Sequence, residues 1–128
     1  VNWRSTAEVA EQLGRPQQTL IDARAPARFR GETEPLDPVA GHIPGALNRP
    51  FAMNLDDKGF FKSPEVLRQE FEQLLNGRDP ASVVHHCGSG VSALPNLLAM
   101  AIAGLGTSAL YPGSWSEWCA DPARPIEK

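Results

Sequence analysis

A short apolar segment that ends at a cysteine constrains the fold of this chain most. Residues 82–86 predict a buried strand, because the β-branched pair Val83-Val84 occupies its middle. Cys87 follows, then the turn Gly88-Ser89-Gly90, and then an apolar helical pattern over 91–105. Cys87 is therefore expected at a strand-to-helix junction, where backbone N–H groups and the helix dipole stabilise a thiolate. Because the thiolate is the nucleophilic form of cysteine, the segment predicts an enzyme that uses sulfur.

Strands and helices are predicted to alternate along the rest of the chain. Further strands are expected at 19–23, just before residue 49, and at 109–111, while helices are expected at 5–13, 26–30, 63–75 and 114–118. In the helix after Cys87, the pattern predicts a buried stripe of Leu94, Leu97, Leu98, Ile102 and Leu105. The alternation indicates an α/β fold, with a mostly parallel central sheet flanked by helices on both faces. Functional side chains of such folds lie beyond the carboxyl ends of the strands, which is where Cys87 is placed.

Length and charge narrow the function classes. The 128 residues are predicted to form one domain, 1–128, with a core large enough to need no disulfide between Cys87 and Cys119. Acidic and basic residues are interspersed and the net charge is −3, so neither nucleic acid nor a membrane surface is an expected partner. The chain lacks an initiator Met and can be a fragment; thiol chemistry favours a reducing, cytoplasmic location.

Three other chemistries of cysteine fit the sequence poorly. A tyrosine phosphatase needs an Arg six residues after its cysteine to hold phosphate, and that position is Ala93 here. A Cys-His protease needs a histidine that faces the sulfur, whereas His86 is adjacent in a strand and points to the opposite face; His85 and His42 remain possible. The histidines and Cys87 also lack the spacing of a zinc site.

Four motifs in order give a more specific resemblance. The segment Cys87-Gly88-Ser89-Gly90-Val91-Ser92 resembles the active-site loop of the 3-mercaptopyruvate sulfurtransferases of the rhodanese superfamily, with Ser92 in place of the usual Thr. Residues 22–31 (DARAPARFRG), 41–48 (GHIPGALN) and 113–118 (GSWSEW) are similar to three further motifs of that superfamily. The resemblance implies a rhodanese-like fold and the C-terminal catalytic half of a tandem-domain enzyme, whose N-terminal rhodanese-like domain this chain does not contain.

The resemblance also implies a mechanism and its residues. Cys87 would take a sulfur atom from a small donor as a persulfide, with Gly88, Ser89, Gly90, Val91 and Ser92 supplying hydrogen-bond donors around that sulfur. Arg28 would hold the anionic group of the donor. The acceptor would be cyanide, a small thiol or a thioredoxin-like protein, and the relay needs no cofactor and no metal. Structural roles are expected for Asp22, Arg24, His42, Trp115 and Trp118.

Two departures from the resemblance leave the donor open. The mercaptopyruvate enzymes carry a second substrate Arg nine residues after the one that matches Arg28, where this chain has Asp37; Arg30 or Arg49 could substitute. The thiosulfate enzymes carry a cation inside the cysteine loop, which this chain lacks. The loop favours 3-mercaptopyruvate as the donor, and the alternatives are a thiosulfate:cyanide sulfurtransferase and a non-catalytic rhodanese-like module that binds partners or senses redox state.

Overall fold

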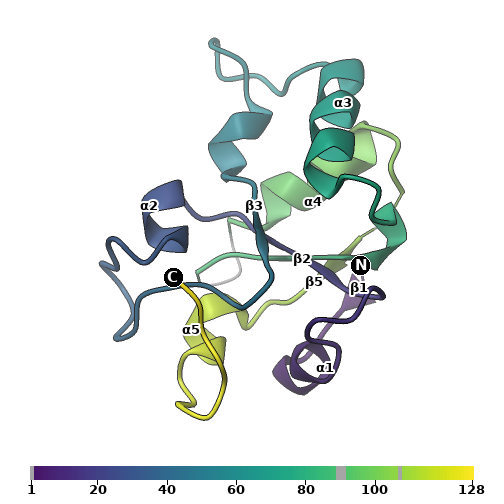
Figure 1. Cartoon of the computed structure of the whole chain (residues 1–128). Helices are drawn as coiled ribbons and strands as arrows, with labels where there is room; N and C mark the ends of the chain where they lie inside the picture. The colour runs from purple at the N-terminus through teal and green to yellow at the C-terminus, as the bar shows by residue number, and fades with distance from the viewer. Residues whose placement is uncertain (1, 89–91, 107) are drawn as a thin grey trace.

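A parallel five-stranded sheet forms the centre of the molecule (Figure 1). The computed structural model describes residues 2–88, 92–106 and 108–128. The strands lie in the order β1-β5-β4-β2-β3, and each described pairing is parallel. Their bounds are β1 Asn2–Trp3, β2 Thr19–Asp22, β3 Leu47–Asn48, β4 Val83–His86 and β5 Ala109–Leu110. The strand before Cys87 is the middle one, as a buried apolar segment predicts.

Helices cover both faces of this sheet, which confirms the predicted α/β class (Figure 1). Helices α1 and α5 lie against one face, and α3 and α4 pack together on the other. The helices are α1 Thr6–Glu11, α2 Pro26–Phe29, α3 Pro64–Leu75, α4 Leu94–Ile102 and α5 Ser114–Trp118, with 3₁₀ turns η1 Phe51–Asn54 and η2 Pro80–Ser82.

Local sequence explains where these helices begin and end. Ser5 caps α1 through a capping box with Glu8, whose side chain accepts from the Ser5 backbone. Ser63 caps α3, and Pro64 follows it in the first turn, where its missing N–H is not needed. Helix α3 ends at Asn76, which adopts a left-handed conformation with φ of 49°. These boundaries match those predicted from the sequence.

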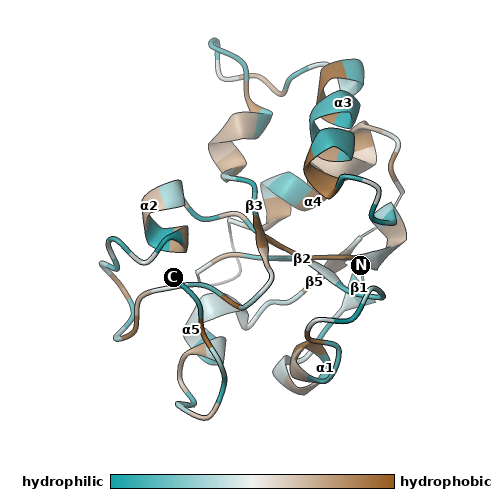
Figure 2. Ribbon diagram, in the orientation of Figure 1, coloured by the Kyte–Doolittle hydropathy of each residue, from teal (hydrophilic) through white to brown (hydrophobic). Residues whose placement is uncertain are grey.

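Two hydrophobic cores hold the layers together. Under α1 and α5 the core contains Trp115 and Trp118, both fully buried. Under α3 and α4 it contains Phe71 and Met100, also fully buried. In Figure 2, much of β2 is coloured hydrophobic because both of its faces are covered, whereas α3 shows hydrophobic and hydrophilic sides. The two tryptophans therefore have the structural role that was expected of them.

The apolar stripe predicted after Cys87 is correct in part: Leu97, Ile102 and Leu105 are partly buried against the cores, whereas two other leucines are not. Leu94 and Leu98 are each 49% exposed, and the buried positions of the helix are Asn96, Ala99 and Met100. The helix is also shorter than predicted: it begins at Leu94, with Pro95 in its first turn, and ends at Ile102. On α3, Val66 is 39% exposed, whereas Leu67, Phe71 and Leu75 are buried.

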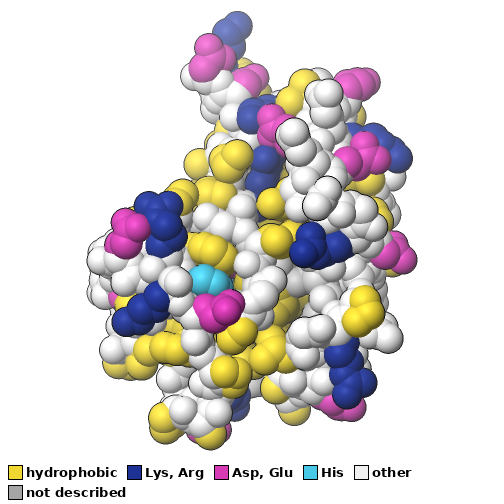
Figure 3. Space-filling view, viewed as in Figure 1, with side chains coloured by type: hydrophobic (Ala, Val, Ile, Leu, Met, Phe, Trp, Pro, Cys, Tyr) yellow, Lys and Arg dark blue, Asp and Glu magenta, His cyan; other side chains and the backbone are white. Residues whose placement is uncertain are grey.

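The surface agrees with the charge pattern of the sequence. On the face shown in Figure 3, basic and acidic side chains are interspersed among hydrophobic ones. Within the described residues, helices are too short or too polar to cross a membrane.

Candidate active site

Cys87 lies directly beyond the carboxyl end of β4, beside the end of β2, where Asp22 pairs with His86. The residue is about 1% exposed and packs with Ala23, Ala93 and Leu110. Cys87 and Cys119 are both buried and are not joined in a disulfide. The predicted position of the cysteine beyond the carboxyl end of a central strand is therefore confirmed.

The start of α5 holds the main chain of Cys87 in place. Ser114 Oγ accepts a hydrogen bond from the Cys87 N–H at 3.0 Å and donates one to the carbonyl of Tyr111 at 2.9 Å. The N–H groups of Trp115 and Ser116 donate to the carbonyls of Cys87 and Gly88, each at 2.9 Å. Three of these hydrogen bonds fix the backbone of Cys87 and Gly88, and the bond to Tyr111 holds Ser114 in place. The sequence predicts Ser114 as the cap of α5; instead Gly113 precedes the helix, and the Ser114 hydroxyl serves the cysteine.

Arg28 lies against the first residue of the cysteine loop. A Cβ atom on Gly88 would lie 3.0 Å from Arg28 Nη2 and 3.3 Å from Nη1, so glycine at this position makes room for the guanidinium. The Arg28 side chain is 18% exposed, and its buried Nε has no hydrogen-bond partner among the described residues. A guanidinium in this position can bind an anion beside the residue that follows Cys87. Helix α2 and the loop that follows Cys87 therefore bring together two of the residues singled out in the sequence.

Two carboxylates share this arginine, and the sequence did not identify Glu34 as one of them. Arg28 Nη2 donates to Glu34 Oε2 at 3.0 Å, and Asp37 Oδ2 lies 3.8 Å from the same nitrogen. Asp37 Oδ2 also accepts a hydrogen bond from Ser116 Oγ at 3.1 Å. Burial opposes ionisation of Glu34, but hydrogen bonds from the Asp37 and Leu36 backbone and from Arg28 outweigh it and lower its pKa. Glu34 is therefore an anion next to the arginine.

A buried ion pair supports the loop between β2 and α2. Arg24 donates to both carboxylate oxygens of Asp22, with Nη2 at 2.8 Å, and the same Nη2 donates to the Gly41 carbonyl at 2.7 Å. Burial opposes the charge on Asp22, yet His86 and Arg24 outweigh it and lower the pKa of the carboxyl well below its ordinary value. These contacts link the 22–31 motif to the 41–48 motif, which agrees with the structural role expected for Asp22 and Arg24.

His42 also organises a turn, as expected. Its Nδ1 lies 2.7 Å from the Phe29 carbonyl, its ring stacks on Phe29 with centroids 3.9 Å apart, and its backbone pairs with Glu127. His42 therefore anchors the end of α2, the helix that carries Arg28, to the C-terminal segment.

The other arginines considered as substitutes for the second substrate Arg are engaged elsewhere. Arg30 pairs with Glu32 on an exposed surface. Arg49 is buried and contacts Asn54, Glu70 and the ring of Phe71. Of the predicted loop residues, Gly88 is buried and Ser92 is partly buried, while Ser89, Gly90 and Val91 lie outside the described residues.

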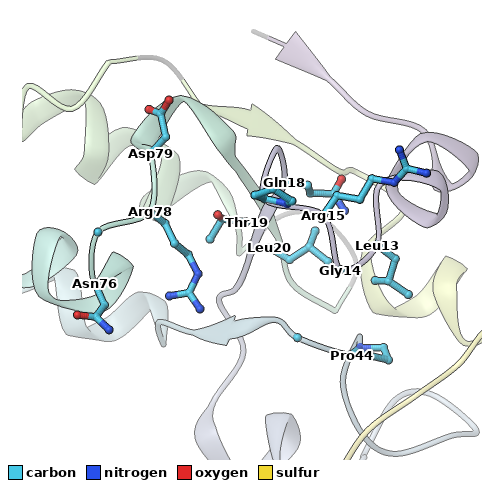
Figure 4. Close-up of a pocket in the computed structure, with 13 residues that line it drawn as sticks. Leu13, Gly14, Arg15, Gln18, Thr19, Leu20, Pro44, Asn76, Arg78 and Asp79 are labelled. Carbon is cyan, nitrogen blue, oxygen red and sulfur yellow. The ribbon is translucent and has the colours of Figure 1, made fainter.

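A surface pocket at the opposite end of the sheet contains none of these groups (Figure 4). It lies beside the start of β2, and Figure 4 shows Thr19 and Leu20 at its wall with Arg78 and Asp79 to one side. Cys87 and Arg28 do not line this pocket. The candidate site is therefore the region around these two residues at the carboxyl ends of the strands, and not this pocket.

The chain is similar in sequence to known sulfurtransferases. It is 54% identical over 120 residues to a protein of Pseudomonas aeruginosa named "Probable 3-mercaptopyruvate sulfurtransferase", covering 94% of this chain and 42% of the relative. It is 38% identical over 115 residues to the thiosulfate sulfurtransferase of Bos taurus, covering 87% of this chain and 38% of that protein. The chain thus spans about two fifths of the length of these curated relatives.

A solved structure and a family model are similar to the chain over nearly its whole length. The Tum1 protein from Saccharomyces cerevisiae superposes with a TM-score of 0.83 and 29% identity over 99% of this chain and 46% of that one. Residues 5–121 match the family described as "Rhodanese-like domain", which includes the four motifs and the Cys87–Arg28 site. This chain therefore belongs to the rhodanese-like domain family.

Proposed function

We propose that this chain is the C-terminal catalytic domain of a sulfurtransferase that moves a sulfur atom from 3-mercaptopyruvate to cyanide or a thiol. The observation that carries the proposal is the contact between Arg28 and Gly88, which sets an anion-binding group beside the residue that follows Cys87. The relatives' names support sulfur transfer as the reaction and leave both 3-mercaptopyruvate and thiosulfate as donors. The domain, 1–128, would work beside an N-terminal rhodanese-like domain.

The first half-reaction forms a persulfide on Cys87. The thiolate attacks the sulfur of the donor, an S–S bond forms, and the C–S bond of 3-mercaptopyruvate breaks. The electron pair of that bond leaves with carbon as the enolate of pyruvate, which takes up the proton released by the donor thiol. The Cys87 sulfur is formally oxidised and the donor carbon is reduced, so no external oxidant is needed.

The second half-reaction regenerates the thiolate. An acceptor thiolate or cyanide attacks the outer sulfur of the persulfide, the S–S bond breaks, and its electron pair returns to Cys87. A small thiol or a thioredoxin-like protein would serve as the acceptor in a reducing compartment such as the cytoplasm. Neither step uses a metal or an organic cofactor.

Different site residues bind the donor and stabilise the transferred sulfur. Arg28 binds the carboxylate of the donor through its guanidinium, with the buried Nε available to a ligand. The backbone N–H groups of the loop from Gly88 to Ser92 stabilise the charge on the outer sulfur, with Ser89 and Ser92 as additional hydroxyl donors. Ser114 and the start of α5 keep the Cys87 backbone in register for this role.

Mass spectrometry tests the proposal directly. The chain is incubated with 3-mercaptopyruvate and, in parallel, with thiosulfate, and peptides are analysed without reductant. We expect an added mass of one sulfur atom on Cys87 that disappears on addition of cyanide. The Cys87→Ser variant should gain none, while Cys119→Ser, which removes the other thiol, should gain it normally. An unmodified Cys87 after both donors would show that this chain is not a sulfurtransferase by itself.

A further inference from the structure

We propose that Asp37 sets the donor preference of this site by charge, favouring donors with one negative charge over dianions such as thiosulfate. A mercapto acid whose only anionic group is a carboxylate is the favoured class. The inference rests on the proposed function, because it concerns the donor that reacts with Cys87. Asp37 stands where the mercaptopyruvate enzymes carry their second substrate Arg, and the proposal gives this aspartate a role of its own in selecting the donor.

The geometry places Asp37 in the shell of the anion-binding group. Its Oδ2 lies 3.8 Å from Arg28 Nη2, and the same Nη2 lies 3.0 Å from the position that a Cβ on Gly88 would take. Ser116 Oγ donates to Asp37 Oδ2 at 3.1 Å, and Ser116 N donates to the Gly88 carbonyl at 2.9 Å. Asp37 is therefore tied through one residue to the loop that begins at Cys87.

Negative charges around Arg28 already outnumber positive ones before a donor binds. Arg28 faces two carboxylates, Glu34 at 3.0 Å and Asp37 at 3.8 Å, while Arg24 adds a second positive charge at 3.4 Å from Glu34 and is itself paired with Asp22. The side chains of Arg28, Glu34 and Asp37 are only 18%, 5% and 12% exposed, so water screens these charges weakly. The field at Arg28 is much less positive than that of a lone arginine.

Such a field treats the two donor types differently. The reaction with thiosulfate brings two negative charges to the Cys87 thiolate, whereas 3-mercaptopyruvate brings one. The repulsion energy between Asp37 and a donor is proportional to the charge of the donor. The energetic penalty on binding is therefore about twice as large for the dianion as for the monoanion. A donor with one carboxylate can still use the planar guanidinium of Arg28.

Asp37 rather than Glu34 is the residue that can be tested without breaking the loop. Glu34 accepts from Arg28, Arg24 and the N–H groups of Leu36 and Asp37, so its removal would disturb the fold of this segment. The side chain of Asp37 accepts a hydrogen bond from Ser116, which an asparagine Oδ1 in the same place can also accept.

The experiment compares kcat/KM for 3-mercaptopyruvate and for thiosulfate, with cyanide as acceptor, in three variants of the chain. Asp37→Asn removes the charge and keeps the hydrogen bond. Ser116→Ala removes the hydrogen bond and keeps the charge. Glu32→Gln removes a negative charge from the same loop at an exposed position that pairs with Arg30.

We expect Asp37→Asn to raise the ratio of thiosulfate to 3-mercaptopyruvate kcat/KM by about tenfold. Ser116→Ala and Glu32→Gln should leave this ratio within about twofold of the wild type. Ser116→Ala keeps the charge of Asp37, and the charge removed by Glu32→Gln is exposed and screened by solvent. A ratio unchanged in Asp37→Asn, or changed equally in Ser116→Ala, would overturn the inference while persulfide formation on Cys87 still supports the proposed function. If neither donor modifies Cys87 in the wild type, both fail together.

Discussion

Ser114 Oγ lies 3.0 Å from the backbone nitrogen of Cys87 and accepts its hydrogen bond across 27 residues of sequence. Ser114 has a φ of 56°, a left-handed conformation that a serine rarely adopts, and its hydroxyl also donates to the Tyr111 carbonyl. A residue held in a costly conformation at a functional edge indicates that the surrounding contacts demand it. Here they turn the start of α5 toward the cysteine.

Replacement of Ser114 should weaken both the fold and the site. Ser114→Ala leaves the buried Cys87 N–H without its partner, so the free energy of unfolding should fall by about 1–3 kcal/mol. Ser114→Gly loses the same hydroxyl but relaxes at positive φ, and should be more stable than the alanine variant by about 0.5–1 kcal/mol. Urea unfolding measures both values. Persulfide formation on Cys87 should slow in each variant, and wild-type stability in Ser114→Ala would contradict the role of this hydrogen bond.

Arg28→Lys should lower kcat/KM for 3-mercaptopyruvate even though the substitution keeps the positive charge. Lysine keeps the positive charge beside Glu34 but loses the planar guanidinium and its Nε donor. Loss of one charge-assisted hydrogen bond predicts a fall of about 10- to 100-fold in kcat/KM for 3-mercaptopyruvate, mostly through KM. Steady-state kinetics measures this.

The control for Arg28 is Arg30→Lys on the same segment, where the side chain is exposed and pairs with Glu32. It should leave kcat/KM close to the wild-type value. The rate at which cyanide removes sulfur from a preformed persulfide should also change little in Arg28→Lys, because the donor has left by then. An unchanged KM in Arg28→Lys would show that Arg28 does not bind the donor.

His85 predicts how stability depends on pH. Burial, and then the nearby His86, lower the pKa of His85 from 6.5 to about 3, and its Nε2 lies 2.9 Å from Ser108 Oγ in the core. The folded state keeps the ring neutral, whereas the unfolded chain takes up a proton below about pH 6.5. Stability should therefore fall as the pH drops from 6.5 toward 3, with this residue contributing up to about 1.4 kcal/mol per pH unit.

His85→Gln removes that titration and leaves a side chain that can bond to Ser108. Urea unfolding at several pH values should then give a shallower loss of stability between pH 6 and 4 than in the wild type. Parallel curves for the two proteins would mean that His85 is not the group responsible.

The sequence predicted the site in part. The strand-to-helix junction placed Cys87 correctly because the apolar segment before it and the glycines after it are local signals. Arg28 was found only through resemblance, and its neighbour Glu34 was missed, because their contact depends on how the 31–41 loop folds back on α2. The role of Ser114 was also missed, since a hydrogen bond to a residue so distant in sequence leaves no periodic pattern.

The fold was predicted from the same kind of local signal. The prediction failed where tertiary packing decides which side chains are buried. The capping box of Ser5 and Glu8, the prolines and the buried strand predicted the order of the elements and most of their boundaries. In α4 the side chains of Ala99 and Met100 pack in the core under α3, whereas Leu98 is 49% exposed. Buried Asn96 is tolerated there because it donates to the Arg49 carbonyl and accepts from Asn54.

Two alanine substitutions in α4 test whether the face with Met100 or the face with Leu98 is the buried one. Met100 is fully buried in the core under α3, so Met100→Ala should lower the free energy of unfolding by about 2–5 kcal/mol. Leu98 is 49% exposed, so Leu98→Ala should lower it by no more than about 1 kcal/mol. The two variants share a helix and a replacement, so helix propensity nearly cancels between them. Urea unfolding with equal m-values gives the comparison, and a larger loss in Leu98→Ala would restore the leucine stripe as the buried face.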